Sequence, residues 1–225
     1  MTPTVLVFDL DGTLVDTKHD LANALNAVLA QEGHTPVSTQ SLGHLFGHGA
    51  RALLRKGLEL NGVAAPDSAL LDRLQPAFLD HYRANIAVES HPFPGAVDAM
   101  AALRARGFRI AVCTNKTEAL ARQLLDTLGL SAAIDAFVGG DTYARSKPNA
   151  EPVLGAISRA GGQPARAVMI GDSKTDVDAA RAACIPVIAV TFGYASVPVA
   201  DLSPDAIISA FQTLPETLAA LGLTP

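Results

Sequence analysis

Short apolar runs that alternate with helix-like patterns constrain the fold of this 225-residue chain more than any other feature. The runs are nearly continuous in apolar residues, as in Val187-Ile188-Ala189-Val190, so both sides of each strand need cover. Alternation with helices supplies that cover through βαβ crossovers, which build a parallel sheet. The sequence therefore predicts an α/β fold, a Rossmann-like parallel sheet with helices on both faces. Strands are expected at 5–9, 109–114, 136–140, 167–171, 186–191 and 205–208, and helices at 94–106, 117–128, 151–161, 174–183 and 213–221.

Residues 16–91 interrupt this alternation. Helical patterns at 17–33, 49–60 and 68–85 follow one another with no strand among them. Prolines and a glycine at 92–95 then mark the return to alternation. We expect an α/β core domain formed by 1–15 and 92–225, and an inserted α-helical cap domain formed by 16–91.

Two aspartates follow the first apolar run, where Asp9 and Asp11 flank Leu10. Residues i and i+2 of a strand point to one face, so we expect both carboxylates to enter the same small volume. Two like charges at that separation require a cation or a shared proton. Gly12 allows the chain to leave the strand sharply and to approach a ligand closely.

Three further polar segments also follow predicted strands. They are Thr114-Asn115-Lys116, Lys147-Pro148 and Gly171-Asp172-Ser173-Lys174-Thr175-Asp176. Taken singly, Thr114 and Asp172 could cap helices and Lys147 could be a solvated loop charge. Because ligands of open α/β sheets bind at the carboxyl ends of the strands, their shared position predicts one site.

The four segments, in this order, resemble the motifs of the haloacid dehalogenase-like hydrolase superfamily of aspartate-nucleophile phosphatases. The resemblance implies a Mg²⁺-dependent phosphomonoester hydrolase that forms an aspartyl-phosphate. It makes Asp9 the nucleophile and Asp11 the general acid and base, while Thr114, Asn115 and Lys147 hold the phosphoryl group. It assigns the Mg²⁺ to Asp9, the backbone carbonyl of Asp11, Asp172 and Asp176.

Within that superfamily the chain looks like the bacterial phosphoglycolate phosphatases, which implies 2-phosphoglycolate as substrate. The segments that carry this likeness are Asp20-Leu21, Gly47-x-Gly49-Ala50, Phe93-Pro94 and Thr191-Phe192-Gly193-Tyr194. The chain departs from the usual pattern at Thr117 and at Asn149-Ala150-Glu151. A sugar phosphate, a nucleotide or pyrophosphate therefore remains an alternative substrate.

The predicted cap offers a second binding segment. Gly47 and Gly49 precede a helix, whose free N–H groups suit an anion, although an ordinary tight turn fits the same residues. A substrate carboxylate there would also need a cation. Arg51 offers a fork-shaped guanidinium, and Lys56 better matches the position of the basic residue in the family.

Other activities of the same fold make different demands. A dehalogenase needs neither Mg²⁺ nor an acid at Asp11. A phosphomutase needs a base in the cap, for which His19 is the candidate. A phospho-acceptor switch would hold its phosphate on Asp9, whereas the long cap and Asp11 favour turnover.

Composition limits the partners. The net charge of −5, without a basic stripe, argues against nucleic acid, and no apolar run reaches the roughly 18 residues of a membrane span. The opening Met1-Thr2-Pro3-Thr4 lacks the features of a secretory signal, so a cytoplasmic protein is expected. The expected partner is a small phosphorylated metabolite, and the sequence does not decide between a monomer and a homodimer.

Overall fold

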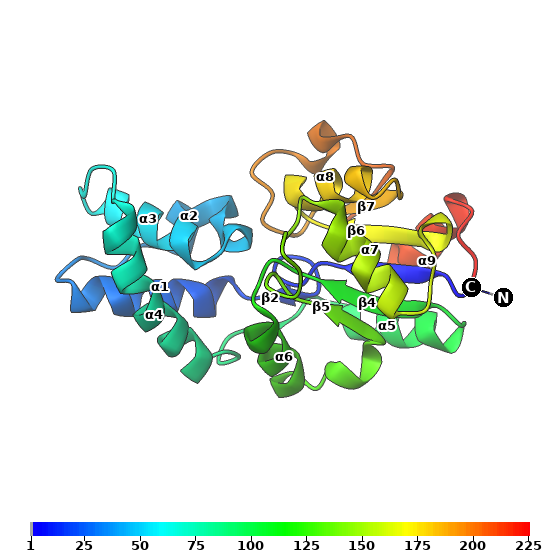
Figure 1. Cartoon of the computed structure of the whole chain (residues 1–225), viewed down its shortest axis with the longest axis horizontal. Helices are drawn as coiled ribbons and strands as arrows, with labels where there is room; N and C mark the ends of the chain where they lie inside the picture. Colours follow the sequence, from blue (N-terminus) through cyan, green and yellow to red (C-terminus); the bar gives the residue numbers. More distant parts are fainter. Residues whose placement is uncertain (1) are drawn as a thin grey trace.

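The structure, a computed structural model, describes residues 2–225 and contains the six-stranded parallel sheet predicted from the apolar runs (Figure 1). The strand order is β5–β4–β1–β6–β7–β8, so the first strand lies in the interior of the sheet and the chain crosses to either side of it. The strands are β1 (Val5–Phe8), β4 (Arg109–Cys113), β5 (Ala136–Val138), β6 (Ala167–Gly171), β7 (Val187–Val190) and β8 (Ala206–Ile208).

Helices cover both faces of this sheet, as the continuous apolar runs require. Alternate residues of β1 enter two different hydrophobic clusters, with Leu6 and Phe8 in one and Val5 and Val7 in the other. All four side chains are fully buried. The helices of this part are α5 (Ala96–Ala105), α6 (Glu118–Thr127), α7 (Ala150–Arg159), α8 (Lys174–Ala182) and α9 (Leu214–Ala220).

A group of helices is inserted between two very short strands, β2 (Val15–Asp16) and β3 (His91–Pro92), which pair antiparallel. These helices, called here the helical insertion, lie together at one end of the molecule, in blue to teal in Figure 1. They are α1 (Lys18–Gln31), α2 (Thr39–Leu42), α3 (Ala50–Leu60) and α4 (Ser68–Ala84). The sequence patterns predicted the three long helices but not α2, β2 or β3.

Asp20 connects the two chain segments that run between the sheet and the helical insertion. Its buried carboxylate, in the first turn of α1, accepts hydrogen bonds from the backbone N–H groups of Glu89 (3.1 Å) and Ser90 (2.8 Å) and from the Ser90 hydroxyl (2.7 Å). The outgoing and returning segments are therefore held at one point. Within residues 2–225, no helix combines the length and the apolar character needed to span a membrane.

Candidate active site

The polar segments meet at one edge of the sheet. Asp9 directly follows β1, Thr114 follows β4, and Asp172 follows β6. These three strands are neighbours and parallel, so their carboxyl ends lie side by side. A cavity of about 270 Å³ opens between this edge and the helical insertion, and it is lined by residues from both.

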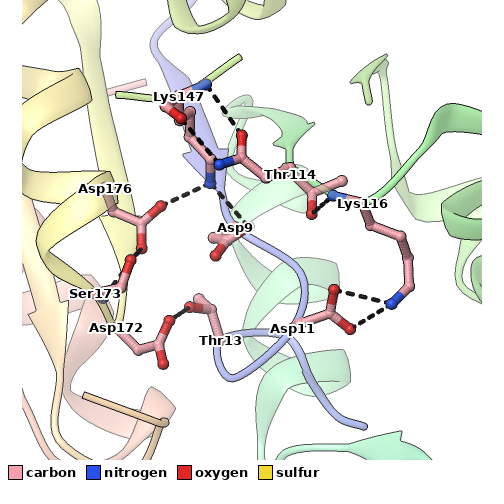
Figure 2. A network of polar contacts seen from close by, with 10 residues as sticks. Asp9, Asp11, Thr13, Thr114, Lys116, Lys147, Asp172, Ser173 and Asp176 are labelled. Atoms are coloured by element: carbon pink, nitrogen blue, oxygen red, sulfur yellow. Dashed lines mark hydrogen bonds and ion pairs between the residues drawn. The ribbon is translucent and has the colours of Figure 1, made fainter. Parts of the chain in front are cut away.

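Three buried carboxylates and one ammonium form the centre of the site (Figure 2). Asp9, Asp172 and Asp176 each place an oxygen atom within 4.8 Å of the others. The Nζ atom of Lys147 lies 2.9 Å from Oδ1 of Asp9 and 2.6 Å from Oδ1 of Asp176. With all four groups ionised, this cluster carries a net formal charge of −2.

The pKa values of these groups reflect the net negative charge of the cluster. Burial and then the Asp176 carboxylate raise the pKa of Asp9 from 3.8 to about 7. Burial, Asp176 and Asp9 together raise the pKa of Asp172 well above its ordinary value. Burial opposes the charged form of Lys147, but Asp176 and Asp9 raise its pKa above the usual range. A divalent cation would relieve this repulsion, and carboxylate oxygens are the donors that Mg²⁺ prefers.

Local contacts fix each member of the cluster. Asp176 lies in the first turn of α8, where its Oδ2 accepts hydrogen bonds from the backbone N–H (3.1 Å) and hydroxyl (2.6 Å) of Ser173 in a capping box. Asp172 accepts from the backbone N–H of Tyr194 (2.6 Å). A Cβ added at Gly12 would stand 2.5 Å from Oδ2 of Asp172, so the backbone at Gly12 approaches this carboxylate too closely for any residue with a side chain.

Asp11 lines the same cavity as Asp9 but has different partners. Its carboxylate is directed to the other side, where Oδ1 and Oδ2 lie 2.9 and 3.0 Å from Nζ of Lys116 (Figure 2). Oδ1 also accepts a hydrogen bond from the Thr17 hydroxyl (2.7 Å). Both carboxylates therefore enter one cavity, as expected, but they pair with different ammonium groups. Because β1 ends at Phe8 and the chain turns over residues 10–14, with Gly12 at a φ of 85°, the alternation of a strand does not set the direction of Asp11.

Thr114 and Asn115 support the site in different ways. The Thr114 oxygen accepts a hydrogen bond from the backbone N–H of Lys116 (3.1 Å), which leaves its O–H to donate to a ligand in the cavity. The Asn115 side chain instead pairs with the backbone of Lys147, donating to its carbonyl (2.9 Å) and accepting from its N–H (3.0 Å). The side chain of Asn115 thus positions the backbone of Lys147.

The helical insertion supplies the facing wall of the cavity. Gly47, Gly49 and Arg51 line it, with Gly49 as the residue before α3. The Arg51 guanidinium forms an ion pair with Asp72 of α4. Lys56 lies further along α3 and is not among the described residues that line the cavity. The rest of this wall is largely apolar, and it includes Leu21, Phe46, Phe78, Leu79 and Tyr82.

Lys116 and Tyr82 line the cavity but had no role in the sequence analysis. Lys116 is the last residue of the quoted Thr-Asn-Lys segment, so its position was visible although its partner was not. Tyr82 lies near the end of α4, and its ring faces the Lys116 ammonium at 4.6 Å. No sequence signal separates Tyr82 from an ordinary core aromatic, because the contact joins segments far apart in the chain.

The chain is similar to known proteins in both sequence and fold. Residues 3–183 match the family model described as haloacid dehalogenase-like hydrolase. A phosphoglycolate phosphatase of Agrobacterium fabrum is 46% identical over 94% of this chain and 91% of its own length. One of Caulobacter vibrioides is 43% identical over 94% and 89%. A crystal structure from Haemophilus somnus, described as a predicted phosphoglycolate phosphatase, superimposes with a TM-score of 0.88 at 27% identity, over 96% of this chain and 98% of that one.

Proposed function

Since the chain belongs to the haloacid dehalogenase-like hydrolase family and is a phosphoric monoester hydrolase, we propose that it hydrolyses 2-phosphoglycolate with Mg²⁺ through an aspartyl-phosphate on Asp9. One observation carries the chemical part of this proposal. Asp9 is a buried carboxylate at the end of β1 that faces both a cavity and a cluster of hard oxygen donors. That arrangement suits a nucleophile that works beside a divalent cation.

Phosphoryl transfer begins with an oxygen of the Asp9 carboxylate attacking phosphorus. The bond from phosphorus to the leaving oxygen breaks, the electron pair stays with that oxygen, and Asp11 supplies its proton. Lys147 and the Thr114 hydroxyl hold the transferring oxygens, since this chemistry depends mainly on positioning and charge stabilisation. Asp9, the Asp11 carbonyl and Asp172 would hold the Mg²⁺, which offsets negative charge on the phosphoryl group.

Hydrolysis of the phosphoenzyme completes the cycle. Asp11, now a carboxylate, takes a proton from a water molecule as the water oxygen attacks phosphorus. The bond between phosphorus and the Asp9 oxygen breaks, which restores the Asp9 carboxylate and releases inorganic phosphate. Asp176 takes part by holding Lys147, because its Oδ1 accepts from Lys147 and its Oδ2 from Ser173.

The substrate assignment rests on the relatives and on the wall formed by the helical insertion. The relatives named phosphoglycolate phosphatase match over nearly the whole chain, including this insertion. Arg51 stands in the first turn of α3, beside the glycine that precedes this helix, and both line the cavity. A guanidinium next to free backbone N–H groups suits a carboxylate. We therefore assign the substrate carboxylate to Arg51 rather than to Lys56, and we regard residues 16–91 as the cap of the α/β core.

The test is a panel of phosphate esters assayed for phosphate release with Mg²⁺, after chelation with EDTA, and after Mg²⁺ is restored. We expect 2-phosphoglycolate to give the highest kcat/KM, EDTA to abolish turnover and Mg²⁺ to recover it. Asp9→Asn should abolish turnover, whereas the matched variant Asp178→Asn, on the exposed side of α8, should not. Full activity after exhaustive chelation, or an active Asp9→Asn variant, would contradict the mechanism. A clear preference for another ester would contradict the substrate alone.

A further inference from the structure

Lys116 is a buried cation that the phosphoryl chemistry leaves without a role. It follows Asn115 in the loop after β4, and its side chain is only 7% exposed. Its ammonium contacts both oxygen atoms of Asp11, at 2.9 and 3.0 Å. Because burying an ammonium is costly unless it is paired, this lysine is held where it is by Asp11.

Tyr82 brings the helical insertion into the same contact. Its ring lies 4.6 Å from the Lys116 ammonium, within the range of a cation–π interaction. The side chain is 1% exposed, so the contact between the ring and the ammonium is buried. A cation–π contact is stronger when it is removed from water.

The result is a carboxylate fixed from two directions. The Thr17 hydroxyl donates to Oδ1 of Asp11, and Lys116 contacts both oxygens. These contacts fix the position of the Asp11 carboxylate at the cavity, which Asp11 and Lys116 both line. In the proposed mechanism, hydrolysis of the phosphoenzyme needs this carboxylate in place to take a proton from water.

We propose that Lys116 is a positioning residue that holds Asp11 as the general base of the second half-reaction, and that Tyr82 confines Lys116 there while the helical insertion is seated on the core. This inference rests on the proposed function. It assigns the Asp11 partners to the breakdown of the phosphoenzyme rather than to its formation. Replacing Lys116 or Tyr82 should therefore slow the hydrolysis of the phosphoenzyme and leave the rate of its formation unchanged.

The experiment is pre-steady-state hydrolysis of p-nitrophenyl phosphate with Mg²⁺. The p-nitrophenolate leaving group departs without needing a proton, so Asp11 is needed only for the second step. For Lys116→Met we expect kcat to fall at least tenfold, which is less than the roughly 10²- to 10⁴-fold loss of a missing general base because Asp11 itself remains. KM should fall by the same factor and kcat/KM should stay unchanged. A burst of one p-nitrophenolate per enzyme, and a phosphorylated protein in the mass spectrum, should accompany the change.

Three other variants serve as controls. Lys174→Met removes an exposed lysine of α8 and should give wild-type kinetics without a burst. Tyr82→Leu should lower kcat and KM together by roughly 2- to 30-fold, as expected from the loss of a cation–π contact. Tyr82→Phe keeps the ring and should restore most of that loss. Thermal melts show which variants are folded, and Lys116→Gln replaces Lys116→Met if the latter does not fold.

The possible failures are distinguishable. If Lys116→Met lowers kcat/KM as much as kcat and shows no burst, Lys116 has only a structural role and the inference is overturned. If Tyr82→Phe loses as much as Tyr82→Leu, the part concerning the ring is wrong. If Asp9→Asn still forms a phosphoprotein or turns over, the proposed function fails as well, and the inference fails with it.

Discussion

Removal of Mg²⁺ should make the stability of this protein fall as the pH rises through neutrality. In the metal-free cluster, burial and Asp176 raise the pKa of Asp9 from 3.8 to about 7. The folded protein therefore keeps a proton on Asp9 that the unfolded chain has already released. Stability from a group with a raised pKa is fully present below the unfolded value and is lost as the pH rises through the folded one.

The size of this effect follows from the shift. About three pKa units correspond to roughly 4 kcal/mol of unfolding free energy, of which about 3 kcal/mol should be lost between pH 5 and pH 8. In a chain of this length 1 kcal/mol changes the melting temperature by about 2 to 4 °C, so a fall of roughly 6 to 12 °C is expected. Asp172 also has a raised pKa, so its titration adds to the loss in the same direction.

Differential scanning calorimetry of EDTA-treated protein at several pH values is the assay. Asp9→Asn is the control, because an amide resembles the neutral carboxyl group. At pH 5 the variant and the wild type should melt at similar temperatures, and at pH 8 the metal-free variant should be the more stable of the two. Mg²⁺ at 100 times its dissociation constant should restore about 2.7 kcal/mol to the wild type. A wild-type melting temperature that is flat from pH 5 to pH 8 without metal would refute this reasoning.

Three further changes have distinct expected outcomes. Arg51→Ala should lower kcat/KM for phosphoglycolate roughly 5- to 150-fold, which corresponds to about 1 to 3 kcal/mol, and leave kcat/KM for p-nitrophenyl phosphate nearly unchanged. Lys56→Ala should change kcat/KM for neither substrate. Equal losses on both substrates in Arg51→Ala would contradict the assignment of the carboxylate to Arg51. Asp20→Ala should lower the unfolding free energy, measured in urea, by roughly 2 to 4 kcal/mol, because it leaves the buried donors of Ser90 unpaired. A change below about 0.5 kcal/mol, the usual limit for a surface site, would show that Asp20 does not hold this segment. Gly12→Ala should raise the Mg²⁺ concentration needed for half-maximal activity, because its Cβ would meet Asp172; an unchanged requirement would show that this approach is not tight.

The sheet could be predicted from the sequence because its signal is local. A strand such as β1, apolar at every position, needs cover on both faces whatever its neighbours are. The helices that provide the cover show their own periodicity nearby. The strands β2 and β3 have two residues each, which is too short for a periodic pattern. Their pairing also joins segments separated by the whole helical insertion.

The sequence predicted which residues belong to the candidate site better than it predicted how their side chains are arranged. Strand-end positions identified Asp9, Thr114 and Asp172 because the carboxyl ends of parallel strands must meet. The direction of Asp11 depends on the turn at Gly12 and on an ammonium 105 positions away in the chain. The side-chain amide of Asn115 likewise binds the backbone of Lys147, 32 positions away. Contacts of that kind are set by the folded structure, and no spacing within a motif encodes them.

Asp9 and Asp11 are therefore only two residues apart in the sequence but lie in different charge environments. Asp9 lies with Asp172, Asp176 and Lys147 on the β6 side of the site, where burial and like charge favour a bound cation. Asp11 lies toward β4, where Lys116 keeps it paired without that cation. A nucleophile and a proton-transfer group with the same side chain need different charge environments to act differently. The turn after β1 provides them, because it directs two neighbouring carboxylates to opposite sides of one small cavity.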